Sequence, residues 1–155
     1  MQTFLPEPNL SLSATCLDYK RLGKQRSEAK QILLTLDGKS NGWKHHPAVK
    51  MWENHILALA RYGLICCIEW QRRGYNDNLY EFFFHYDQLR YANEIAMPYW
   101  FGDMYFHRSH RFNLLRKDFS YYAPLFPIEA AMGEKFCQNQ PYVWPSSPNK
   151  NLHIN

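Results

Sequence analysis

A short stretch near the start of the chain combines several cations with one acid. The segment Lys20-Arg21-Leu22-Gly23-Lys24-Gln25-Arg26 contains four basic residues, and Glu28 follows it closely. On a helix that turns about 100° per residue, Lys20 and Lys24 share one face, and Arg21 and Glu28 lie beside them. This pattern predicts a phosphate-binding face with an embedded catalytic acid, or else a solvated face on which Lys24 and Glu28 form an ordinary ion pair.

A second basic stretch lies later in the sequence. Residues 107–117 contain four Lys or Arg and two His but no acid. His107 and His110 have the spacing of metal ligands, but no carboxylate or cysteine is close in sequence, so we expect neither a metal ion nor another cofactor. Cations and hydroxyls in a row suit phosphate contacts better. The residues expected to contact DNA from the two stretches are Lys20, Arg21, Lys24, Arg26, Arg108, Ser109, His110 and Arg111.

Aromatic residues are the other abundant candidates for ligand contacts. Trp, Tyr and Phe make up 17% of the chain, and most of them must fill the core. Trp100 and Trp144 fall in predicted loops, where an indole ring can stack on a nucleobase. The alternative is that both rings cover the core as lids.

Composition limits the class of protein. With 155 residues, 46% of them hydrophobic and 21% charged, the chain predicts one folded domain and excludes wholesale disorder. The net charge of +4 is mildly basic. No signal peptide or membrane span is evident, and the four cysteines lack CxxC spacing, so we expect a cytoplasmic protein with free thiols.

These residues must be positioned by helices, because hydrophobic spacing is helical and strand patterns are absent. We expect an extended segment through Leu10, a helix capped by Ser11 or Ser13 that ends before Asp37-Gly38, and another that begins at Pro47 and bends at Gly63. Further helices are predicted over residues 79–89 and 106–117, followed by a mostly irregular, Pro-rich segment. The predicted fold is therefore all-α, with residues 1–155 in one compact helical domain.

The motifs together resemble the pyrimidine-dimer DNA glycosylase family of the phage endonuclease V type. The resemblance rests on a short N-terminal segment before a basic helix, a helix entered through His46-Pro47, and Phe101-Gly102-Asp103 before the second basic stretch. The opening Met-Gln-Thr-Phe-Leu-Pro and the segment Tyr142-Val143-Trp144-Pro145 are similar to an uncharacterised bacterial and phage branch.

The resemblance implies a bifunctional reaction on double-stranded DNA with damaged or modified pyrimidines. In that family an N-terminal α-amine attacks C1′ of the damaged nucleotide, an imine forms, and β-elimination cuts the strand with the help of a Glu. An α-amine suits this role because its ordinary pKa is about 7.7–8.0, against about 10.4 for a lysine side chain. Here Gln2 is large, so we expect Met1 to be retained as the nucleophile, with Glu28 as the catalytic acid and the protein acting as a monomer.

Two other functions remain compatible with the sequence. The same fold could bind DNA or another nucleotide ligand without chemistry, or its aromatic surface could contact another protein. An acid near the N-terminus favours the enzyme, a blocked or buried amine favours the binding module, and a large apolar patch away from the basic face favours the interaction protein.

Overall fold

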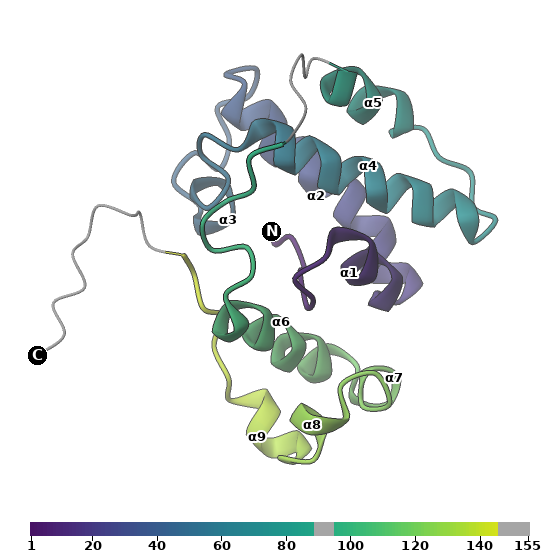
Figure 1. Cartoon of the computed structure of the whole chain (residues 1–155), viewed down its shortest axis with the longest axis vertical. Coiled ribbons are helices and arrows are strands. Elements are labelled where there is room, and N and C mark those ends of the chain that lie inside the picture. The colour runs from purple at the N-terminus through teal and green to yellow at the C-terminus, as the bar shows by residue number, and fades with distance from the viewer. Residues whose placement is uncertain (89–94, 146–155) are drawn as a thin grey trace, which may run out of the picture.

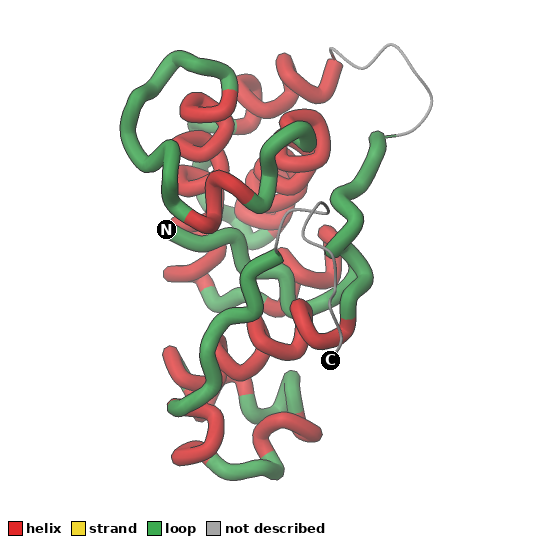
Figure 2. Tube along the Cα trace, turned by 90° about the vertical axis from the view of Figure 1, so that its left-hand side faces the viewer, coloured by secondary structure: helices red, strands yellow, loops and turns green. Residues whose placement is uncertain are grey.

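Every regular element that the structure describes is a helix, which confirms the predicted all-α class (Figure 2). The structure is a computed structural model, and it describes residues 1–88 and 95–145. The helices are α1 (Leu10–Cys16), α2 (Tyr19–Leu36), α3 (Pro47–Lys50), α4 (Ile56–Arg72), α5 (Tyr80–Gln88), α6 (Met104–Lys117), α7 (Phe119–Tyr122), α8 (Pro127–Ala130) and α9 (Glu134–Gln138).

The helices form two groups, with the N-terminal segment between them. The long helices α2 and α4 pack against each other, and α5 covers α4. The shorter helices α7, α8 and α9 gather around α6. In Figure 1 the chain starts between these two groups, next to α1. Residues 2–6 are buried there, so the N-terminal segment is part of the core.

The first predicted helix is in fact two helices, α1 and α2. The break falls at Leu17, whose ψ of 137° is extended, and at Asp18, whose side chain accepts hydrogen bonds from the backbone N–H groups of Lys20 and Arg21. Capping of α1 comes from Asn9, which accepts from the N–H of Leu12 at 2.9 Å. The expected serine caps were therefore wrong, and two Asx caps set the ends of the helices that border the basic stretch.

Two glycines inside helices are explained by aromatic rings that pack on them. The bend predicted at Gly63 does not occur, because α4 continues through this residue. A Cβ at Gly63 would lie 2.3 Å from the ring of Phe83, so the glycine lets α5 approach α4 closely. Gly23 has the same role on α2, where a Cβ would lie 3.1 Å from the indole of Trp70.

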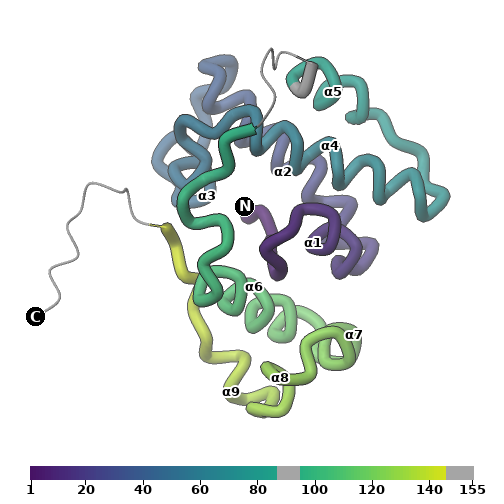
Figure 3. The backbone as a smooth tube through the Cα atoms, in the orientation of Figure 1, coloured from purple at the N-terminus to yellow at the C-terminus, as the bar shows by residue number. Residues whose placement is uncertain are grey.

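The remaining differences concern helix ends. The helix predicted to run on from Pro47 stops at Lys50, and α4 begins after a turn. The helix predicted for residues 79–89 is present as α5, although Leu89 lies outside the described residues. The Pro-rich segment contains three short helices rather than irregular chain alone. After α9 the chain returns past α6 toward α3, as the yellow end of the trace shows in Figure 3.

Candidate active site

A pocket of about 460 Å³ opens where the N-terminal segment crosses α2. Its lining combines one carboxylate with several cations and two aromatic rings: Met1, Gln2, Phe4, Lys20, Arg21, Lys24, Gln25, Glu28, Lys117 and Tyr142. We call Lys20, Arg21, Lys24 and Lys117 the pocket cations. The pocket therefore brings the start of the chain and the basic face of α2 together, and adds residues from α6 and from the segment after α9.

Glu28 supplies the carboxylate of the pocket lining. Its Oε2 accepts a hydrogen bond of 3.0 Å from the backbone N–H of Gln2, and its Oε1 lies 3.5 Å from Nζ of Lys24. The residue is only 8% exposed, so its carboxylate is largely shielded from water. Because Gln2 is bonded to Glu28, the adjoining residue Met1 is held in the same pocket, where it is part of the lining.

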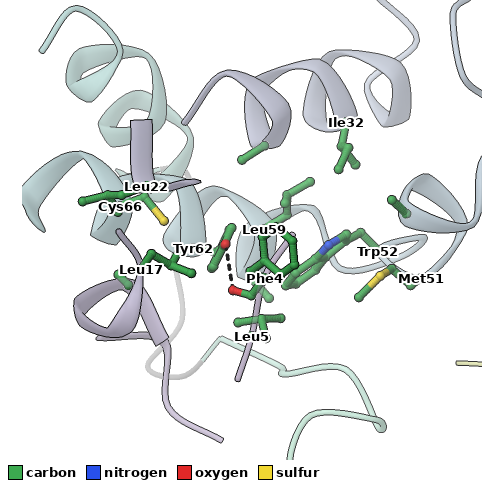
Figure 4. Packing of buried hydrophobic residues seen from close by; sticks show 14 of the residues in the cluster. Phe4, Leu5, Leu17, Leu22, Ile32, Met51, Trp52, Leu59, Tyr62 and Cys66 are labelled. Carbon is green, nitrogen blue, oxygen red and sulfur yellow. Dashed lines mark hydrogen bonds between the residues drawn. The ribbon is translucent and has the colours of Figure 1, made fainter. Parts of the chain in front are cut away.

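Side chains from α2, from α4 and from the turn between α3 and α4 hold the N-terminal segment by hydrogen bonds. Gln25 Oε1 accepts from the N–H of Phe4 at 2.7 Å, and the hydroxyl of Tyr62 donates to the carbonyl of Phe4 at 2.9 Å (Figure 4). Trp52 Nε1 donates to the hydroxyl of Thr3 at 3.0 Å. These three polar side chains are buried, and each satisfies a group that the extended segment cannot satisfy by itself.

Helix α6 holds the next two residues of the same segment from the other side. Nδ1 of His107 lies 2.7 Å from the carbonyl of Leu5, and Nδ1 of His110 accepts from the N–H of Leu5 at 3.0 Å. Arg111 Nε donates to the carbonyl of Pro6 at 2.8 Å. His107 and His110 therefore hydrogen-bond to both backbone groups of Leu5. This is the role of the His–x–x–His spacing that the sequence analysis considered as a metal motif.

Both histidines are held in the neutral form by their surroundings. Burial lowers the pKa of His107, and it lowers the pKa of His110 to about 3, with a smaller contribution from the neighbouring His107. His107 also accepts the N–H of Gly102 at Nε2, so its proton resides on Nδ1 and is donated to the carbonyl of Leu5. His110 must leave Nδ1 unprotonated to accept from Leu5.

Lys117 is a pocket residue that the sequence reasoning did not select. It lies at the end of α6, where its carbonyl accepts from the guanidinium of Arg21 at 3.2 Å. The pKa of Lys117 is lowered, first by partial burial and then by repulsion from Arg21, Arg116 and Lys24. Only its presence in the basic stretch of residues 107–117 could have suggested it, because nothing local in the sequence brings α6 to α2.

The expected DNA-binding residues differ in whether they line the pocket. Lys20, Arg21 and Lys24 line the pocket, whereas Arg26 points elsewhere, forms an ion pair with Asp77, and lies 4.3 Å from the indole of Trp70. The remaining four, Arg108, Ser109, His110 and Arg111, which we call the α6 cluster, do not line the pocket.

Local contacts occupy the α6 cluster. Arg108 and Arg111 both form ion pairs with Glu129, at 3.4 and 3.3 Å, and Arg111 also pairs with Glu7 at 3.3 Å. The hydroxyl of Ser109 donates to the carbonyl of Phe106 at 2.7 Å. His110 is fully buried, so its ring has no access to a phosphate group in this conformation. These side chains support the N-terminal segment and the packing of α8 on α6.

The two tryptophans expected to stack on bases also differ. Trp100 is 3% exposed, packs against Trp52 with ring centroids 5.0 Å apart, and donates from Nε1 to the carbonyl of Met51. Trp100 therefore belongs to the core, which agrees with the alternative prediction that its ring covers the core. Trp144 is half-buried, and its ring lies 5.5 Å from that of Tyr142, which lines the pocket.

Metal clusters and membrane-spanning helices were also considered for the part of the chain that the structure describes. Residues 1–88 and 95–145 contain no cluster of three or more His, Cys, Asp or Glu with the geometry to hold a metal ion. Among the same residues, no helix has both the length and the apolar character needed to cross a membrane.

The arrangement defines a class of helical protein in which the start of the chain, a buried carboxylate and several cations share one pocket. Residues 1–80 match the family described as pyrimidine dimer DNA glycosylase, and this match covers more than half of the chain. The chain therefore belongs to the pyrimidine dimer DNA glycosylase family, which supports a DNA glycosylase function and a DNA substrate. No curated protein and no solved structure gives a significant match.

Proposed function

We propose that the protein is a DNA glycosylase and abasic-site lyase that acts on damaged or modified pyrimidines through the α-amine of Met1. The observation that carries this proposal is the 3.0 Å hydrogen bond from the N–H of Gln2 to Glu28 within a cationic pocket that Met1 also lines. An amine nucleophile, a carboxylate and phosphate-binding cations are the three components that such a reaction needs.

The chemistry can be written through these groups. The Met1 amine attacks C1′, and the bond from C1′ to the base breaks, so that the base leaves with the electron pair and takes up a proton. The amine then loses its protons as the imine forms, and the C1′–O4′ bond opens with a proton delivered to O4′. Removal of a proton from C2′ then expels the 3′ phosphate by β-elimination, and water hydrolyses the imine.

Glu28 is suited to two of the proton transfers in this scheme. Its carboxylate can take a proton from the attacking amine and deliver that proton to O4′, and the regenerated carboxylate can then remove the proton from C2′. The pocket cations bind the phosphates on either side of the reacting sugar. The hydrogen bonds along residues 2–6 fix the direction in which the chain enters the pocket, and this positions the amine without further ordering on substrate binding.

Reduction with borohydride on DNA containing an abasic site tests the proposal directly. We expect a stable protein–DNA adduct, because reduction converts the imine into an amine that water cannot cleave. Mass spectrometry of the digested adduct should place the sugar on Met1, and acetylation of the N-terminus should prevent the adduct. Glu28→Gln should slow strand cleavage by about 10²- to 10⁴-fold even where the adduct still forms.

The same experiment separates the alternatives. An adduct on Lys117 or Lys24 would keep the lyase activity but move the nucleophile to a side chain, and the variants Lys117→Gln and Lys24→Gln would then lose the adduct. No adduct on abasic, dimer-containing or modified-base DNA would contradict the enzyme and leave a DNA-binding module of the same fold.

A further inference from the structure

A row of aromatic rings leads away from the pocket along the surface. Tyr142, which lines the pocket, lies 5.5 Å from Trp144, measured between ring centroids. Trp144 lies 6.1 Å from His46, and His46 lies 5.6 Å from Trp43. Both contacts of His46 are edge-on, with interplanar angles of 89° and 79°. We call Trp43, His46 and Trp144 the aromatic shelf.

The outer residue of the shelf is unusual for a tryptophan. Trp43 is 61% exposed, whereas Trp52 and Trp100 are almost completely buried. Its φ of 66° lies in the left-handed region, where a bulky side chain is a genuine outlier. Backbone strain of this kind persists where the surrounding structure imposes it, and it occurs often at ligand-binding positions. Because the Trp43 ring is mostly exposed, packing in the core does not explain the positive φ of this residue.

His46 connects the shelf to the chemistry of the pocket. Its Nδ1 accepts the N–H of Ala48 and caps α3, so the ring is fixed in position and carries its proton on Nε2. Burial lowers the pKa of His46, and the charge of the N-terminal amine lowers it further, while Glu28 opposes this shift. The pKa of His46 therefore responds to the charges of the two proposed reacting groups.

We propose that Trp43 and Trp144 bind a nucleobase of the same DNA strand whose sugar and phosphates occupy the pocket, with His46 as the positioning residue between them. This inference rests on the proposed function. Continuity with the pocket argues for this occupant, because Tyr142 lines the pocket and contacts Trp144 of the shelf, and the pocket cations supply phosphate binding at one end. Exposed rings beside a cationic groove are the usual means of holding bases out of the stack.

The test measures binding of a duplex that contains a non-reactive abasic analogue and one 2-aminopurine, placed opposite the analogue or on either side of it. 2-Aminopurine is bright when unstacked and dark when stacked on another ring. We expect one of the two placements beside the analogue, which share its strand, to stay dark with the wild-type protein and to become bright with Trp43→Ala. A response confined to the placement opposite the analogue would contradict binding of a base from the same strand. The same variant should weaken binding of this duplex about tenfold.

Three further variants separate stacking from folding. Trp43→Asn tolerates the positive φ better than Ala and should show the same loss, whereas Trp43→Phe keeps a ring and should retain most of the affinity. Tyr105→Ala removes a ring that is 78% exposed and lies outside the shelf and the pocket, and it should have no effect. The salt dependence of binding should not change in any of them, because no phosphate contact is removed.

The outcomes are distinct from those of the borohydride experiment. If Trp43→Ala and Trp43→Asn bind like the wild type and all three placements give the same fluorescence, the shelf does not bind a base, whatever the chemistry of Met1. If affinity and fluorescence respond as expected but no borohydride adduct forms, the shelf stands as a DNA-binding surface and the proposed reaction fails.

Discussion

The two basic stretches of this chain have similar compositions in the sequence but opposite surroundings in the fold. Of the four pocket cations, Lys24 pairs with Glu28 and Arg21 pairs with Asp18, and the group faces an open cavity. The arginines of the α6 cluster instead meet Glu129 and Glu7, which approach from α8 and from the N-terminal segment. Positive charge therefore remains in excess at the pocket and is largely neutralised on α6.

The difference shows that the role of a basic run depends on acids that the fold delivers from elsewhere. On α6, Arg111 holds the segment that carries Met1, and Arg108 pairs with Glu129. At the pocket, the positive charge in excess of the two local acids is available to an external anion. The site thus has a supporting region on α6 and a pocket region on α2, and variants that affect one without the other can test this division.

The largest effect is expected from the acid of the pocket. Glu28→Gln keeps the size of the side chain but removes the carboxylate, so the rate of strand cleavage at an abasic site should fall about 10²- to 10⁴-fold. Glu7→Gln changes an acid that pairs with the α6 cluster and should leave this rate within about twofold, since it has no proposed part in general acid–base catalysis. Single-turnover kinetics measure the rate of strand cleavage in each variant. Equal losses of rate in both variants would contradict the division between the two regions.

The next effect concerns stability. Arg111→Met removes the hydrogen bond to the carbonyl of Pro6 and leaves the buried carboxylate of Glu129 with a weaker set of partners. We expect the free energy of unfolding to fall by about 3 kcal/mol, as for other broken buried ion pairs. Arg72→Met is the control, because Arg72 is an exposed partner of Glu69 and its loss should cost no more than about 1 kcal/mol. Denaturant titration measures both, and similar losses would contradict a supporting role for α6.

A smaller effect is expected on the salt dependence of DNA binding. Replacing both Lys20 and Lys24 by Gln should reduce the slope of log K against log salt by about 1.8, because two phosphate contacts are lost. Arg108→Gln should leave the slope unchanged, since this arginine already pairs with Glu129. Fluorescence anisotropy at several salt concentrations gives the slopes. If the slope changes in the Arg108 variant and not in the lysine variant, phosphate binding belongs to α6 and not to the pocket.

The fold was predictable from the sequence to the extent that it depends on local patterns. The apolar spacing of α2, α4, α5 and α6 and the stop signal at Asp37-Gly38 were read correctly, and the all-α class followed from them. The break at Leu17 was missed because an Asx cap at Asp18 competes with continued helix there. The bend at Gly63 was wrong because a ring from α5, remote in sequence, occupies the space that the missing Cβ leaves.

The site was predictable only in its α2 portion. Helical spacing alone relates Lys20, Lys24 and Glu28, so the basic face with one acid could be derived. The ion pairs of the α6 cluster, the burial of His110 and the presence of Lys117 in the pocket all depend on how distant segments pack. No pattern within one helix reveals which charges the rest of the chain will neutralise.

The last prediction tests the supporting region through its pH dependence. The pKa of buried His110 is lowered to about 3, whereas an unfolded histidine has a pKa of about 6.5. Between these values the unfolded chain binds more protons than the folded chain, so stability must fall as the pH decreases through this window. His107, whose pKa is also lowered by burial, contributes in the same direction.

The measurement compares the wild type with His110→Asn, in which an amide oxygen can still accept the N–H of Leu5 but no group titrates. From about pH 7.5 to about pH 5.5 the wild type should lose about 1.4 kcal/mol more in its free energy of unfolding than the variant does. The variant starts from a lower stability because the imidazole packs against Phe106 at 4.4 Å, so only the change with pH is diagnostic. Parallel pH profiles would mean that His110 titrates in the folded state near its ordinary pKa, which would contradict a neutral His110 that accepts the N–H of Leu5.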